Sequence, residues 1–148
     1  MGKRWRRILV PIQFSQRLPA AELELARELA RANHAKIQLL HVVPLFPAVA
    51  ADAGLAAQYY LKAQENAELR LRKMARSKLK NLPVEIVVEV SSPGAMIVKQ
   101  AAKLRADLVI IATHGRTGIK RYLLGSVAEH LVARCPCPLL TIRPGTER

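Results

Sequence analysis

The segment Ile8-Leu9-Val10-Pro11-Ile12 decides the fold class, because its apolar side chains occupy consecutive positions rather than alternate ones. A strand of this kind is buried on both faces, as in parallel sheets that helices cover from two sides. A second such strand is predicted over residues 36–43, and it ends before Pro44, which lacks the N–H that a central strand donates. The sequence therefore predicts a parallel α/β sheet.

Helical patterns alternate with these strands. After Pro19, apolar residues at spacings of three and four predict a helix to about Asn33. The expected buried stripe of this helix consists of Leu18, Ala21, Leu25, Leu29 and Ala32. Residues 45–51 form a predicted loop, and Asp52 is expected to cap a long helix to about Asn81.

The second half of the chain continues the alternation. Strands are predicted over residues 84–90, 107–112 and 139–142, and helices after a turn at residues 91–94 and over residues 126–134. Ile97, Ala101 and Leu104 form the expected buried stripe of the third helix. Five strands joined by helices imply right-handed crossovers, so helices cover both faces of the sheet and ligands bind beyond the carboxyl ends of the strands.

Length and composition fit one domain over residues 1–148. A chain of 148 residues buries about 68 to 70% of its unfolded surface, enough for one core. No apolar stretch reaches the roughly 18 to 20 residues of a membrane span, and no apolar signal region separates Met1–Arg7 from the first strand. We expect a cytoplasmic protein that does not enter a membrane.

The net charge of +13 favours polyanions in general and does not choose among nucleotide, nucleic acid and anionic lipid. The densest basic run, Lys3 to Arg7, is either a phosphate-binding arm or a solvated terminus. We favour the solvated terminus, because Lys and Arg also spread along residues 62–80 and 99–105 as on polar helix faces.

Cys135 and Cys137 are the two cysteines of the chain. If the segment that carries them is extended, their side chains point the same way without meeting easily as a disulfide. They could give two thiolates to zinc, but a structural zinc site takes four ligands and the chain has no second pair, so we expect ordinary buried thiols and no metal site.

The chemistry is concentrated in residues 112–127, between the fourth strand and the fourth helix. Gly115, Gly118 and Gly125 let backbone N–H groups turn towards phosphate oxygens, and Arg116, Lys120 and Arg121 add positive charge between them. The start of the following helix also favours an anion. Ser126 and Glu129 alternatively form a capping box, which would explain the serine without a ligand but not the basic, glycine-rich loop.

The spacing matches neither the P-loop nor the dinucleotide fingerprint. It resembles instead the universal stress protein family, over essentially the whole chain: residues 8–15, 39–43, 112–127 and 136–144. ATP-binding members have Gly, two residues, Gly, nine residues, Gly, then Ser or Thr. Ala112, Gly115, Gly125 and Ser126 occupy those four places here.

The resemblance implies a single-domain, Rossmann-like fold of the adenine nucleotide alpha hydrolase-like type, with a five-stranded sheet of order 3-2-1-4-5. It implies dimers joined through the fifth strand and ATP lying across the strand ends. The site residues expected from it and from the loop are Pro11, Ile12, Gln13, Val42, Ala112, His114, Gly115, Arg116, Gly118, Gly125, Ser126 and Val127. Gln13 replaces the usual aspartate and offers no carboxylate to magnesium, and Ala112 replaces the first glycine.

No reaction centre stands out. His41 is expected to have a structural role at a strand end, His114 either contacts the ligand or orders its loop, and Ser15 lacks the pattern of an activated nucleophile. We therefore expect binding, with at most slow ATP hydrolysis.

The leading hypothesis is a nucleotide-binding regulatory protein that acts as a homodimer with protein partners. One alternative is a universal stress protein that has lost ATP binding and acts through dimerisation. An adenylating enzyme is disfavoured because no Ser-Gly-Gly-x-Asp-Ser loop follows the first strand. Nucleic-acid binding is disfavoured because few aromatic residues are present to stack bases.

Overall fold

The computed structural model describes residues 4–14, 19–46, 52–113 and 125–143. Five strands form one parallel sheet in the order β3-β2-β1-β4-β5, as predicted. The elements are β1 (Arg7–Pro11), α1 (Ala20–Asn33), β2 (Lys36–Val43), α2 (Ala53–Lys78), β3 (Val84–Val90), α3 (Pro93–Leu104), β4 (Leu108–Ala112), α4 (Ser126–Arg134) and β5 (Leu139–Ile142).

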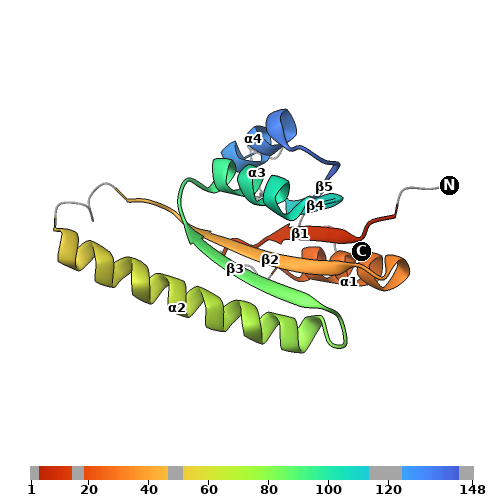
Figure 1. Ribbon diagram of the computed structural model, residues 1–148, viewed down its shortest axis with the longest axis horizontal. Coiled ribbons are helices and arrows are strands. Elements are labelled where there is room, and N and C mark those ends of the chain that lie inside the picture. Colours follow the sequence, from red (N-terminus) through yellow and green to blue (C-terminus); the bar gives the residue numbers. More distant parts are fainter. Residues whose placement is uncertain (1–3, 15–18, 47–51, 114–124, 144–148) are drawn as a thin grey trace.

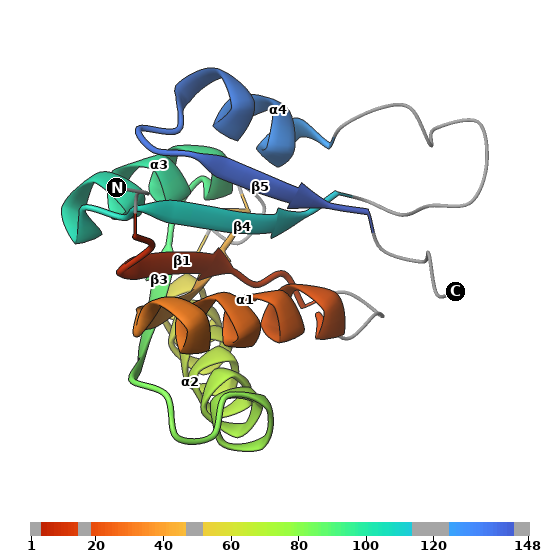
Figure 2. The ribbon, with the colours of Figure 1, turned by 90° about the vertical axis from the view of Figure 1, so that its right-hand side faces the viewer.

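The sheet lies between two helical layers, with α1 and α2 on one face and α3 and α4 on the other (Figure 1; Figure 2). The central strand β1 explains the consecutive apolar run. Ile8 and Val10 pack into the cluster beneath α1 and α2, whereas Leu9 packs into the cluster beneath α3 and α4. All three side chains are fully buried, because each face of the strand meets its own helical layer.

Several predicted boundaries move by a few residues. The first strand spans Arg7–Pro11 instead of 8–12, and the fourth begins at Leu108 instead of Asp107. Helix α2 ends at Lys78, short of Asn81, because the chain turns there and Asn81 takes a left-handed φ of 64°. Pro93 and Gly94 belong to the first turn of α3 instead of the preceding turn, since proline suits the first helical position.

The predicted buried stripe of α1 is wrong, because the helix buries a neighbouring face. The buried residues are Glu22, Leu23, Ala26 and Ala30. Leu25 and Leu29 are only half-buried at the margin of the core, and Ala32 is exposed. The carboxylate of Glu22 interrupts the apolar pattern of the face that is buried, which is why hydrophobicity alone selected a neighbouring face.

Three polar side chains form a hydrogen-bonded series from α3 through β2 to β3. The Gln100 amide donates to Gln38 Oε1 at 2.8 Å, and the Gln38 amide donates to Glu85 Oε2 at 3.1 Å. Lys36 Nζ lies 3.2 Å from the same carboxylate oxygen. The hydrogen bonds from Gln38 and Lys36 lower the pKa of Glu85 below its ordinary value.

Asp107 holds the start of β1 in place, since its Oδ2 accepts from the backbone N–H groups of Arg6 and Arg7, both at 2.9 Å. The side chains of Arg4, Arg6 and Arg7 are exposed, in keeping with the expected solvated terminus. Among the described residues, no helix is both long and apolar enough to cross a membrane.

Candidate functional site

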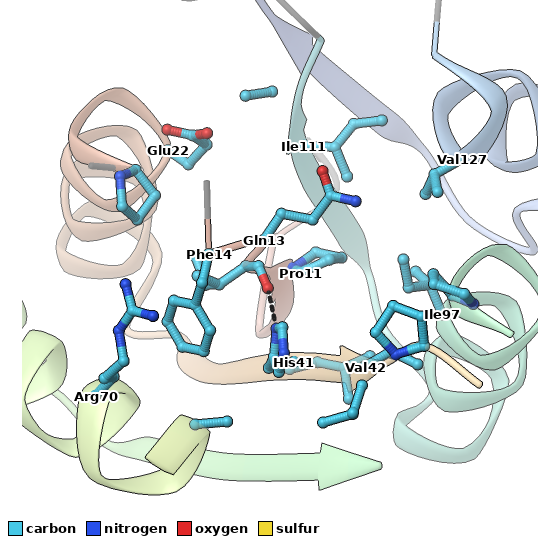
Figure 3. Close-up of a pocket in the computed structure, with 18 of the residues that line it drawn as sticks. Pro11, Gln13, Phe14, Glu22, His41, Val42, Arg70, Ile97, Ile111 and Val127 are labelled. Carbon is cyan, nitrogen blue, oxygen red and sulfur yellow. Dashed lines mark hydrogen bonds between the residues drawn. The ribbon is translucent and has the colours of Figure 1, made fainter. Parts of the chain in front are cut away.

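A cavity of about 1000 Å³ opens beyond the carboxyl ends of β1, β2 and β4. Strand β1 lies between β2 on one side and β4 on the other, so the strand order reverses at this point. Such a reversal leaves a crevice in which parallel α/β sheets bind ligands. Figure 3 shows the side chains of β1, β2 and β4 converging on the cavity with helices on both sides.

The cavity gathers most of the described site residues that the sequence predicted. It is lined by Pro11, Ile12, Gln13, Val42, Ala112, Gly125 and Val127. Ser126 is exposed and does not line it. His114, Gly115, Arg116 and Gly118 lie outside the described residues, as does Ser15.

The start of α4 forms one wall of this cavity. Gly125 is the N-cap, and no side chain hydrogen-bonds the cap. The capping box, the alternative that would explain Ser126 without a ligand, is therefore wrong, because Ser126 is the first residue of the helix and not its N-cap. Among the described residues, no side chain accepts from the first N–H groups of this helix beside the cavity, an arrangement that favours an anion.

Gly125 has φ −64° and ψ 159°, a conformation that other residues adopt easily. Backbone strain therefore does not require a glycine here. The absent side chain instead leaves the backbone accessible from the cavity that Gly125 lines.

Ala112 is the last residue of β4, and its φ is not in the left-handed region. An alanine side chain therefore fits the backbone that the family pattern assigns to a glycine. The substitution adds one methyl group to the wall of the cavity without straining the strand.

Helix α2 contributes a wall that the sequence did not predict. Tyr59, Ala63, Asn66, Ala67 and Arg70 lie three or four residues apart and line the cavity together. This helical spacing could have identified the wall, but Arg70 lies in a run of charged residues that we assigned to solvent. Arg70 is indeed exposed, and its guanidinium also stacks 3.9 Å from the centroid of the Phe14 ring.

Phe14 in turn lies against His41, with ring centroids 4.4 Å apart (Figure 3). His41 Nδ1 lies 2.8 Å from the carbonyl oxygen of Ile12. Because a carbonyl only accepts, Nδ1 carries the proton and donates it. Burial lowers the pKa of His41 below its ordinary value, and the charge of Arg70 lowers it further, against the opposing effect of the hydrogen bond.

A neutral His41 thus fixes the backbone that follows β1, which is the structural role expected of it. Glu22, on α1, adds a buried carboxylate to the lining of the cavity. Within the described ranges, no three His, Cys, Asp or Glu side chains cluster as metal ligands. Gln13 points into the cavity towards Ile111 and contributes an amide (Figure 3).

The fold and this crevice define a Rossmann-like α/β protein with a cavity at the strand-order reversal. The model of the universal stress protein family matches residues 4–143. The chain belongs to the universal stress protein family.

Sequence and structural relatives agree with this assignment. Universal stress protein MJ0531 of Methanocaldococcus jannaschii is 30% identical over 146 residues, covering 94% of this chain and 82% of the relative. The structure of MJ0577 from the same organism has a TM-score of 0.84 at 23% identity, covering 98% of this chain and all of that one. A universal stress protein of Arabidopsis thaliana, solved with AMP bound, has a TM-score of 0.65 at 18% identity over 96% and 94% of the two chains. At these identities the structures establish the fold alone.

Proposed function

We propose that this protein is a regulatory universal stress protein that binds ATP. The adenine and ribose of the nucleotide would lie near Ile12, Gln13 and Val42. The phosphates would lie near Ala112, Gly125, Ser126 and Val127, together with His114, Gly115, Arg116 and Gly118 of the loop. The observation that carries the proposal is that the β1 and β2 ends share one cavity with the uncapped start of α4.

The charge of the chain supports a polyanionic ligand, since 24 Lys and Arg oppose 11 Asp and Glu. The AMP bound to the Arabidopsis relative agrees with an adenine nucleotide. The chemistry of the cavity favours binding over turnover, because His41 is engaged with the Ile12 carbonyl and no paired acid and base face each other among the described lining residues. We therefore propose hydrolysis that is slow at most.

The test is calorimetry of ATP with the wild type and two variants. We expect a dissociation constant in the micromolar range, about 8 kcal/mol of binding free energy. Gly125→Val should weaken binding at least about tenfold, because its branched side chain occupies the space between backbone and phosphate. Ala133→Val adds the same side chain to an exposed position of α4 and should bind as the wild type does.

Absence of heat or of a thermal shift at about 1 mM ATP, an affinity of only about 4 kcal/mol, would reject ATP binding. Equal binding by Gly125→Val and Ala133→Val would place the phosphates elsewhere.

The alternative function is dimerisation without nucleotide. Strand β5 lies at the edge of the sheet, and Leu139, Leu140 and Ile142 are only half-buried there. An apolar edge strand pairs readily with another copy. Light scattering should give a dimer at about 10 to 50 μM, and Thr141→Lys, at an exposed position of β5, should shift it towards monomer. A monomeric wild type would reject this interface.

A further inference from the structure

Cys135 and Cys137 lie closer together than their sequence predicted. Their Sγ atoms are 3.8 Å apart, and both residues are half-buried. The expectation that the thiols would not readily meet assumed an extended segment, whereas the chain bends at residues 136 and 137. The bend turns the two side chains towards each other.

The fold holds this bend from both ends. The N–H of Cys135 donates to the Leu131 carbonyl at 2.8 Å and so closes the last turn of α4. On the other side, the Pro138 carbonyl accepts from Val109 N at 3.0 Å as β5 begins. Residues 136 and 137 alone connect these two fixed points, and Pro136 restricts the backbone between them further. The proximity of the sulfur atoms is therefore built into the α4–β5 connection.

A disulfide requires an S–S distance near 2.05 Å, so the two sulfur atoms need to approach by about 1.8 Å. Rotation of a cysteine side chain from one staggered rotamer to another moves its sulfur atom by a distance of this order. Both residues are partly accessible, so a small oxidant reaches them.

We propose that Cys135 and Cys137 are a reversible oxidation site, at which a peroxide converts the two thiols into an intrachain disulfide. One thiol releases its proton, the thiolate attacks a peroxide oxygen and the O–O bond breaks, and the hydroxide that leaves takes up the proton, so that a sulfenic acid and water form. The second thiol attacks the sulfenic sulfur, the S–S bond forms, and a second water leaves. Two thiols and one hydrogen peroxide thus give one disulfide and two waters, and a dithiol reverses the change.

A shared metal ion is the competing use of such a pair. Zinc takes four ligands in structural sites, and within the described residues no third His, Cys, Asp or Glu joins these two cysteines. The observations therefore favour disulfide formation.

The experiment exposes the reduced full-length chain to hydrogen peroxide in the presence of EDTA. The chain has only two cysteines, so an intrachain disulfide identifies this pair without peptide mapping. We expect the monomer to lose about 2 Da and both titratable thiols, and dithiothreitol to restore them. Cys135→Ser and Cys137→Ser, each with one thiol left, should instead retain a sulfenic acid that dimedone traps.

The proposal fails if the wild type keeps both thiols at a peroxide dose that labels the single-cysteine variants. It also fails if oxidation yields only disulfide-linked dimers on a non-reducing gel. Thiols that are blocked as purified and released by EDTA would show a metal site instead and would equally overturn it. None of these outcomes depends on ATP binding.

Discussion

His41 Nδ1 donates a 2.8 Å hydrogen bond to the carbonyl oxygen of Ile12, and this bond joins the end of β2 to the segment that follows β1. Phe14 covers the imidazole from one side, and Arg70 covers Phe14. The cavity wall is therefore held by a stack that begins on the sheet and ends on α2. Burial of the imidazole lowers the pKa of His41 below its ordinary value, so His41 adds no positive charge to that of Arg70 at neutral pH.

The stability that His41 contributes should depend on pH. Its pKa is lower in the folded chain than the ordinary value of 6.5, so the unfolded chain binds the proton more readily. The contribution is complete above pH 6.5 and is lost as the pH falls through the folded pKa. Urea denaturation of wild type and His41→Gln at pH 8 and pH 5 tests this.

The difference in unfolding free energy between wild type and His41→Gln should shrink towards pH 5. The glutamine amide also donates to the Ile12 carbonyl but does not titrate, and the other histidines are common to both chains. A difference that stays constant or grows at low pH contradicts the neutral, buried state of His41.

The two helix starts should respond differently to loss of their polar residues. Asp52 Oδ1 accepts from Gly54 N at 2.9 Å and from Leu55 N at 3.1 Å, so Asp52→Ala should cost about 1 kcal/mol. Ser126 makes no such bond, so Ser126→Ala should change stability by less than about 0.5 kcal/mol. Thermal or urea unfolding of the two variants measures both. A larger loss for Ser126→Ala than for Asp52→Ala would restore the capping box.

Gln38 and Gln100 should be strongly coupled. Both are buried, and replacing Gln38 by leucine leaves the Gln100 amide without its acceptor at a cost of about 1 to 3 kcal/mol. Gln100→Leu should cost a comparable amount, whereas the double variant should lose less than the sum of the two. Unfolding in urea for the four members of this cycle tests the coupling, and strictly additive losses would contradict it.

The sequence predicted the sheet well because its signals are local and strong. Pro44 directly follows the second strand and Pro83 directly precedes the third. The consecutive apolar residues of β1 indicate burial on both faces. The alternation of strands and helices predicts a parallel sheet with a ligand site beyond the carboxyl ends of its strands, whereas the strand order came from the family resemblance alone.

The parts that were missed depend on details finer than a residue pattern. Whether Ser126 caps a helix depends on a shift of one residue, since Gly125 takes the N-cap position instead. The approach of Cys135 to Cys137 depends on a two-residue bend. By sequence, Arg70 cannot be distinguished from the other charged residues of α2. Its contact with Phe14 is a tertiary contact between segments far apart in the chain.

Gln13 should make nucleotide binding nearly independent of magnesium. It lines the cavity where family members carry an aspartate, and an amide is a weaker ligand for a hard cation than a carboxylate. We expect the surplus of Lys and Arg to neutralise the phosphates instead, and exposed charge contacts are screened within about 8 Å at physiological ionic strength. Affinity for ATP should therefore change little between magnesium and EDTA, but should fall as salt is raised.

Gln13→Asp should reverse this balance. The new carboxylate repels the phosphates in EDTA and provides a ligand for magnesium, so the variant should bind ATP more weakly than wild type without the metal and recover when it is added. Gln13→Glu, one methylene longer, is the matched control, since it adds the same charge at a different reach. Calorimetric titration of ATP into the three proteins, in magnesium and in EDTA at low and high salt, separates charge from coordination. If wild-type binding collapses in EDTA, another group holds the metal ion, and Gln13 does not determine the metal dependence.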